Sequence, residues 1–160
     1  MLHRDYADQN CSIARALEIV GERWSLLIVR DAFLGVTRFD QFERRLGVAP
    51  NTLTARLRTL TDAGVLERRR YNERPQRYEY VLTPRGKDLF PAIVAIMRWG
   101  DVHQSTNGPP AVVRHIGCGG ALDAHARCDE CGLIVNADDA EWHYGPGSRH
   151  EPGLRPRPPM

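Results

Sequence analysis

The chain contains few cysteines, no long apolar run and almost no net charge, and each shortage excludes a class of protein. Only four of its 160 residues are cysteines, one alone at Cys11 and three between Cys118 and Cys131. This number and spacing do not suit a disulfide framework. No apolar run approaches the ~18 residues that a membrane span needs, and no charged and then apolar leader precedes Cys11. We therefore expect a soluble, cytoplasmic protein with no membrane association.

The usual signatures of catalysis are also missing. The sequence contains no Ser/His/Asp constellation and no glycine-rich phosphate loop. We therefore predict that the chain is not an enzyme. A zinc or thiol enzyme with a helical support domain is the least favoured alternative, because it would need an open metal position or a base beside a thiol.

The net charge of +2 hides an uneven distribution. Residues 38–77 contain ten arginines and five acidic residues, so this segment carries +5 and the rest of the chain carries −3. A concentration of arginine suits the phosphates of nucleic acid. A solvated basic face is the alternative when charge is considered alone.

Two N-terminal helices are predicted, one on each side of Gly21, after an irregular polar arm over residues 1–10. Apolar residues recur at helical spacing in both, and Gly35 is a suitable stop for the second. These residues are Ile13, Ala16, Leu17 and Val20 in the first helix, and Trp24, Leu27, Ile28 and Leu34 in the second.

Two further helices are predicted to meet at Gly47, as a helix-turn-helix. The first covers residues 38–46, and Pro50 suits the first position of the second. Small polar residues followed by arginines on its outward face suit base edges and phosphates, whereas the alternative is an ordinary amphipathic surface helix. The inward residues are Phe39, Phe42 and Leu46, then Leu53, Leu57 and Leu60. The outward residues of the second helix are Asn51, Thr52, Thr54, Ala55, Arg56, Arg58 and Thr59.

A β-hairpin and a long helix are predicted to follow. Strands over residues 65–71 and 77–82 flank a turn-like segment at 72–76. Thr83 is a natural N-cap with Pro84 behind it, and the helix is expected to run to about His103 with a bend at Pro91. Its apolar surface is wider than one short domain needs, which indicates a partner helix.

From Cys11 to Gly100 the chain resembles the HxlR family of winged-helix transcriptional regulators, relatives of the MarR group. The resemblance is carried by Cys11, by GERWSLLIVRDAFLG, by RFDQFERRLGVAPNTLTARLRTLTDAGVLERR, by the wing around Pro75, and by LTPRGKDLF with Trp99-Gly100. It implies a mainly α fold with a small β wing over residues 11–103. It further implies a homodimer, built through the N-terminal and C-terminal helices, on a double-stranded DNA operator. The family often has serine where Ala49 stands, and losing such an N-cap costs ~1 kcal/mol of helix stability.

The pattern and the resemblance together predict which residues contact DNA and which respond to a signal. Some members of the family sense oxidants or electrophiles through a cysteine at the position of Cys11, so we expect a redox or small-molecule effector. The alternative for Cys11 is a buried, unreactive thiol. The predicted DNA contacts are Arg38, Pro50, Asn51, Thr52, Ala55, Arg56, Arg58, Arg68, Arg70, Arg74 and Arg77.

Beyond a predicted linker at 104–110, residues 111–147 have a different composition and are expected to form a small zinc-ribbon-like appendage. His115 with Cys118, and Cys128 with Cys131, are two ligand pairs with two residues inside each, which suits one tetrahedral zinc. Filling all four positions leaves none open for a substrate, so such zinc would be structural, and it would supply stability that a small core lacks.

Several alternatives remain for this appendage. His125 is a second candidate for the histidine ligand, and the alternatives to a zinc site are a tail with reduced thiols or a Cys128–Cys131 redox pair. A metal-sensing regulator, in which the cluster itself is the switch, is the alternative function. The Gly145-Pro146-Gly147 ending resembles an extension on some actinobacterial-type relatives, and residues 148–160 are expected to be disordered.

Overall fold

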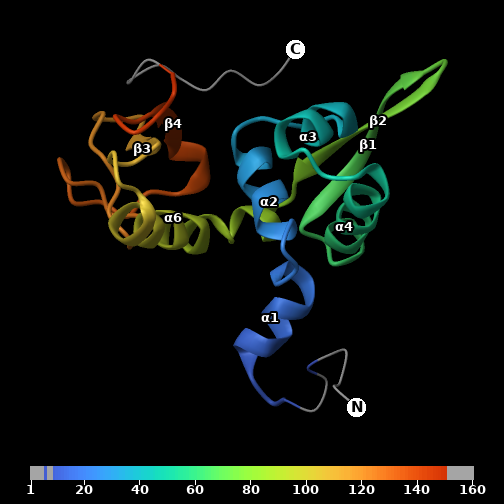
Figure 1. Ribbon diagram of the computed structural model, residues 1–160, viewed down its shortest axis with the longest axis horizontal. Coiled ribbons are helices and arrows are strands. Elements are labelled where there is room, and N and C mark those ends of the chain that lie inside the picture. The colour runs from blue at the N-terminus through green and yellow to red at the C-terminus, as the bar shows by residue number, and fades with distance from the viewer. Residues whose placement is uncertain (1–5, 7–8, 151–160) are drawn as a thin grey trace. The chain divides into compact units, whose positions relative to one another are not determined.

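The computed structural model describes Tyr6 and residues 9–150 (Figure 1). Most of the predicted N-terminal arm, and residues 151–160 of the predicted tail, lie outside these described residues. The contacts between residues divide the chain into two compact units, with the boundary between Gly86 and Lys87. Within the described part, no helix is both long enough and apolar enough to cross a membrane.

The first unit consists of short helices and one antiparallel hairpin, in the order predicted for a winged helix. Its apolar core contains the leucine stripe expected from helical spacing, since Leu53, Leu57 and Leu60 are all buried together with Phe42. The helices are α1 (Ser12–Val20), α2 (Ser25–Phe33), α3 (Phe39–Leu46) and α4 (Pro50–Asp62), and the strands are β1 (Leu66–Glu73) and β2 (Gln76–Leu82).

The turn between α3 and α4 has the conformation that its sequence requires. Gly47 adopts a left-handed φ of 61°, and its N–H donates to the Glu43 carbonyl at 2.9 Å. Pro50 occupies the first turn of α4, where its missing N–H costs no hydrogen bond. Ala49 stands at the N-cap and has no side-chain oxygen to offer, which agrees with the weakened cap expected from the sequence.

A buried carboxylate joins α2 to α3. Asp31 has no exposed surface and pairs with Arg30 at 2.8 Å and with Arg45 at 3.2 Å. The two guanidiniums neutralise a charge that would otherwise be costly to bury. Sequence patterning did not single out Asp31, because nothing local distinguishes it from a surface aspartate on α2.

The hairpin is longer than predicted. β1 and β2 pair from Leu66–Leu82 to Glu73–Gln76, with one irregularity between Arg70 and Asn72, so that only Arg74 and Pro75 connect the strands. The turn predicted over residues 72–76 is therefore wrong in length. Its turn-forming residues are mostly taken up by the strands, because the backbone pairing continues to the tip.

The long helix predicted after the hairpin is two helices. The Thr83 side chain caps α5 (Pro84–Lys87) through the Gly86 N–H at 3.0 Å, as expected. The chain then turns at residues 88–89, and α6 (Phe90–Gln104) begins with Pro91 in its first turn. A new start removes the need for a bend, because proline is tolerated in the first turn of a helix but costs ~3 kcal/mol inside one.

The second unit combines α6 with the cysteine-rich segment. Strands β3 (Ala111–His115) and β4 (Ala140–Tyr144) pair antiparallel, and the short 3₁₀ helix η1 (Ala137–Asp139) leads into β4. Isolated β-bridges continue the pairing through the intervening loops. The small core of these loops and strands contains Val113, Leu122, Ala126, Cys128, Val135 and Trp142.

The Gly145-Pro146-Gly147 sequence pairs with the segment predicted as a linker. The N–H groups of Gly145 and Gly147 donate to the carbonyls of Pro110 and Pro109 at 2.9 and 3.1 Å. A Cβ on Gly145 would lie 2.1 Å from the Pro109 oxygen, so only glycine permits this approach. The backbone on either side of β3 and β4 is thereby joined beyond the ends of the strands.

Candidate DNA-binding surface and candidate metal centre

The exposed face of α4 carries most of the residues predicted to read DNA. Pro50, Asn51, Ala55 and Arg58 are exposed, and Thr52 is half-buried. The Arg58 side chain is 83% exposed and makes only a long 3.5 Å ion pair with Asp62 one turn later. Such a pair is weak in water, so the guanidinium is available to a phosphate or a base.

Arg56 lies differently from the prediction. Its side chain is 24% exposed and pairs with Glu22, in the segment before α2, at 3.6 Å. Arg56 is therefore less exposed than Asn51, Ala55 and Arg58, and its contact with DNA stays a prediction. Arg56 comes three positions after the buried Leu53 and directly before the buried Leu57. It therefore flanks the apolar stripe of α4 instead of opposing it.

The wing arginines are divided between the two faces of the hairpin. Arg68 stacks over the Tyr78 ring at 3.5 Å, and Arg70 pairs with Glu73 at 3.4 Å on the same face. Arg77 follows the opposite parity on β2 and points to the other face. The structure therefore does not bring Arg68, Arg70 and Arg77 together, and Arg74 lies at the tip between the strands.

Two further arginines, Arg38 and Arg69, make contacts at this hairpin. Arg38, just before α3, stacks over the Tyr71 ring at 4.9 Å. Arg69 donates to the Glu67 carboxylate at 2.8 Å, and this hydrogen bond holds the pKa of Glu67 below its ordinary value. Arg69 was not among the predicted DNA contacts.

Apolar side chains are exposed on α1 and, separately, on α6. On α1, Ile13 is 71% exposed and Leu17 is 40% exposed, and both belong to the apolar positions that recur at helical spacing. On α6, Ile96, Trp99 and Val102 are exposed at intervals of three residues, and Trp99 is 60% exposed. Residues three apart share one side of a helix, so α6 carries an apolar stripe.

Cys11 is exposed and stands at the N-cap of α1. In the single chain Cys11 is therefore not the buried thiol of the alternative interpretation. Its accessibility permits chemistry with an oxidant in solution, but exposure alone does not make a thiol reactive.

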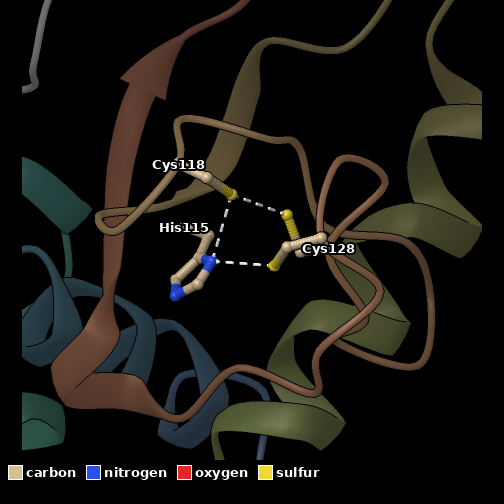
Figure 2. Close-up of side chains that lie close together, drawn as sticks. His115, Cys118 and Cys128 are labelled. Atoms are coloured by element: carbon tan, nitrogen blue, oxygen red, sulfur yellow. Dashed lines mark hydrogen bonds between the residues drawn. The ribbon is translucent and has the colours of Figure 1, made fainter.

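The four predicted metal ligands meet in the second unit. The ligand atoms of His115, Cys118, Cys128 and Cys131 all lie within 4.8 Å of one another. The His115 Nδ1 is 3.3 Å from the sulfurs of both Cys118 and Cys131, and the Cys118 and Cys128 sulfurs are 3.4 Å apart (Figure 2). His125 lies on an exposed turn outside this cluster, so the structure favours His115 over its alternative.

This donor set fits a tetrahedral metal. With zinc bonds of about 2.3 Å to sulfur, the ligand atoms of a tetrahedron are separated by about 3.8 Å. The separations in the cluster range from 3.3 Å to no more than 4.8 Å, so a small adjustment of side chains would meet that geometry. Three thiols and one imidazole are also ligand types that zinc prefers.

The backbone prepares the cysteines for the thiolate form unequally. The Cys131 N–H donates to the Cys128 sulfur, and with the Glu130 N–H it lowers the pKa of Cys128 to about 7 against the cost of burial. At Cys118 the Gly120 N–H acts in the same sense. Its effect is outweighed by the hydrogen bond with Cys128, by desolvation and by Cys131, which together raise the pKa of Cys118.

A glycine follows and closes each ligand pair. Gly119 and Gly132 have φ values of 77° and 72°, and their N–H groups donate to the carbonyls of His115 and Cys128 at 2.8 and 2.9 Å. Gly120 then passes so close to the other pair that a Cβ there would lie 2.4 Å from the Cys128 sulfur. The two turns therefore approach each other edge to edge.

These features define a winged helix-turn-helix protein with an additional cysteine and histidine cluster. Residues 19–107 match the HxlR-like helix-turn-helix family, and the chain belongs to that family. The predicted fold class and the prediction of a transcriptional regulator in place of an enzyme are thereby confirmed.

The sequence similarity to relatives extends beyond the winged helix. The uncharacterized HTH-type transcriptional regulator Rv3095 of Mycobacterium tuberculosis is 47% identical over 137 residues, which cover 85% of this chain and 87% of that protein. A similarity that covers 85% of a 160-residue chain must include residues 25–136, and so the positions of the whole cluster.

Solved structures show the same architecture. The putative transcription factor PA1607 is 38% identical, with a TM-score of 0.56 and 87% of each chain covered. The redox regulator HypR in its reduced form is 27% identical, with a TM-score of 0.56, over 59% of this chain and 94% of its own. The reduced form of the Bacillus subtilis regulator YodB is 26% identical, with a TM-score of 0.51, over 60% of this chain and 96% of its own.

Proposed function

We propose that this protein is a cytoplasmic, sequence-specific regulator that binds an operator as a homodimer. The observation that supports it most directly is α4, which packs through buried leucines and leaves Asn51, Ala55 and Arg58 exposed after the Gly47 turn. A helix held this way presents its N-terminal residues to base edges in the major groove. Family membership supports the same role.

The dimer is proposed from the exposed apolar faces of α1 and α6. Ile13, Leu17, Ile96, Trp99 and Val102 are large apolar residues in contact with water in a single chain, and burying them against a second copy would stabilise an assembly. A homodimer places two α4 helices about one turn of DNA apart, on a rough palindrome.

DNase footprinting with the purified full-length chain tests the proposal. We expect two protected half-sites centred about 34–36 Å apart, at or near the gene for this protein or elsewhere in its genome. Asn51→Ala should relax base preference in a binding selection, at a cost of about 1–3 kcal/mol at the affected base pair. A genome-wide search that finds no protected site would refute the proposal.

A redox signal at Cys11 is the proposed input. The thiol is exposed at the start of α1, the helix that we assign to the dimer, and two structural relatives were solved in states described as reduced. Oxidation of Cys11 would then alter the spacing of the two α4 helices. Cys11→Ser should bind DNA like the wild type but lose its response to peroxide or a quinone. An equal response in both proteins would exclude Cys11 as the sensor.

We also propose that His115, Cys118, Cys128 and Cys131 hold one structural zinc ion. The convergence of their ligand atoms and the glycine-closed turns support this assignment. Protein purified without chelator or affinity metal should contain close to one equivalent of zinc. Less than about a tenth of an equivalent, with all four thiols titratable in the native protein, would refute it. A reversible change in operator affinity on chelation and restoration would favour a metal sensor instead.

A further inference from the structure

The two ligand pairs belong to a short internal repeat. Residues 114–119 read Arg-His-Ile-Gly-Cys-Gly, and residues 127–132 read Arg-Cys-Asp-Glu-Cys-Gly. Each copy places an arginine before the first ligand and a glycine after the second, and the copies are 13 residues apart. The arginines have no role in metal coordination, because a guanidinium donates hydrogen bonds only.

Both arginines make the same contact. The Arg114 Nη1 donates to the Gly119 carbonyl at 2.7 Å, and the Arg127 Nη1 donates to the Gly132 carbonyl at 2.6 Å. Each side chain therefore spans its own turn, from the residue before the first ligand to the glycine after the second. The glycine N–H bonds to His115 and Cys128 close the same turns from the inside.

The position of Arg127 is itself fixed by its surroundings. The Asp123 carboxylate accepts the N–H groups of His125 and Arg127 at 2.7 and 2.9 Å, and these bonds lower the pKa of Asp123. In the other copy, the backbone of Arg114 is the strand partner of Glu141 in β4, and it forms an isolated β-bridge with Ala121. The backbone of both arginines is thus held in place by hydrogen bonds or strand pairing.

The net charge of a metal-loaded centre would favour positive side chains beside it. Three thiolates and a neutral imidazole around a divalent cation have a net charge of −1. Two guanidiniums beside the turns oppose that charge and also fix the turns mechanically. Asp129 and Glu130, inside the second turn, add further negative charge, which the Arg127 guanidinium also offsets.

We infer that Arg114 and Arg127 are positioning residues of the metal centre, each of which holds one ligand pair in the geometry that the metal requires. The inference rests on the proposed zinc site. It predicts that removal of either side chain weakens metal binding without removing a ligand, and that the two removals have similar effects because the two contacts are alike.

Titration of the full-length protein with Co²⁺, followed by competition with Zn²⁺ in the presence of a chromophoric chelator, tests the inference. Arg114→Gln and Arg127→Gln should each bind metal about 10–100-fold more weakly than the wild type, which is the usual effect of losing an outer-shell partner. Arg149→Gln removes the same charge from an exposed position of the same unit and should bind like the wild type.

Lysine variants separate the hydrogen bond from the charge. Arg114→Lys and Arg127→Lys keep a positive charge but lose the planar fork, so they should remain at least fivefold weaker than the wild type. Full recovery by lysine would overturn the positioning role. Wild-type affinity in both glutamine variants would overturn the inference as a whole. A wild-type protein without the tetrahedral thiolate spectrum of Co²⁺ would instead refute the zinc site itself.

Discussion

The wing offers a quantitative test of DNA binding, because its arginines differ in how far they are already engaged. Arg68 stacks on Tyr78 and Arg70 pairs with Glu73, whereas Arg74 and Arg77 are exposed and make no ion pair with any residue that the structure describes. Arg74 and Arg77 are therefore the wing charges that contact with phosphate would engage at the lowest cost.

The perturbation is the double variant Arg74→Gln/Arg77→Gln. Each phosphate contact contributes about 0.9 to the slope of log affinity against log salt, and a homodimer loses two contacts for each residue replaced. Four lost contacts reduce the slope by about 3.6. Between 50 and 200 mM salt, wild-type affinity should therefore fall roughly 150-fold further than that of the variant.

Fluorescence anisotropy on an operator fragment and on an unrelated duplex, over that range of salt, provides the measurement. The variant should lose affinity for both duplexes alike, because backbone contacts carry no base preference. Arg69→Gln is the matched control: Arg69 is already bound to Glu67 at 2.8 Å, so its loss should change the slope by less than 1 unit, an estimate from the same relation. An unchanged slope in the double variant would refute the assignment of the wing tip to the DNA backbone.

Three further substitutions test the fold and the cluster. Leu57→Ala should lower the free energy of unfolding by about 2.7–5 kcal/mol in urea, because Leu57 is 1% exposed. Asp31→Asn should cost about 3 kcal/mol in the same assay, at the lower end for a broken buried pair because both partner arginines are partly exposed. Gly120→Ala should abolish metal binding, since its Cβ would lie 2.4 Å from the Cys128 sulfur, whereas Gly100→Ala has open space and should not. A Gly120→Ala protein with full metal affinity would show that the two turns need not meet there.

Features that depend on local sequence were predictable. The αL glycine at residue 47, the leucine stripe of α4 and the Thr83 cap follow from periodicity and from the conformational preferences of single residues. The convergence of the four candidate ligands followed from their spacing, because two residues between ligands allow both to face one point. The choice of His115 over His125 needed the structure, since both histidines lie close in sequence to the cysteines.

Features that depend on distant segments were not predictable. Arg56 meets Glu22 across 34 residues, and the pairing of Pro109 with Gly147 joins segments that share no sequence pattern. The break before α6 was missed for another reason. Pro91 signals either a bend or a helix start, and only the turn at residues 88–89 decides between them.

We expect that loss of the proposed metal weakens the proposed dimer as well as the metal-binding loops. Helix α6 belongs to the same compact unit as the cluster, and Lys87 pairs with Asp138 of η1 at 2.6 Å within that unit. The exposed Trp99 stripe that we assign to the dimer therefore lies in the same compact unit as the cluster. Chelation should raise the dimer dissociation constant at least tenfold in sedimentation velocity, by about 1.4 kcal/mol or more.

The winged-helix unit should retain its far-ultraviolet circular dichroism after chelation, because its leucine core lies in the other unit. A Trp99→Glu variant, monomeric with or without metal, gives the reference for full dissociation. If the wild-type protein loses its metal and remains as dimeric as before, then α6 does not depend on the cluster. The apolar stripe would then be held by the helix alone, and the metal would stabilise only the loops that bind it.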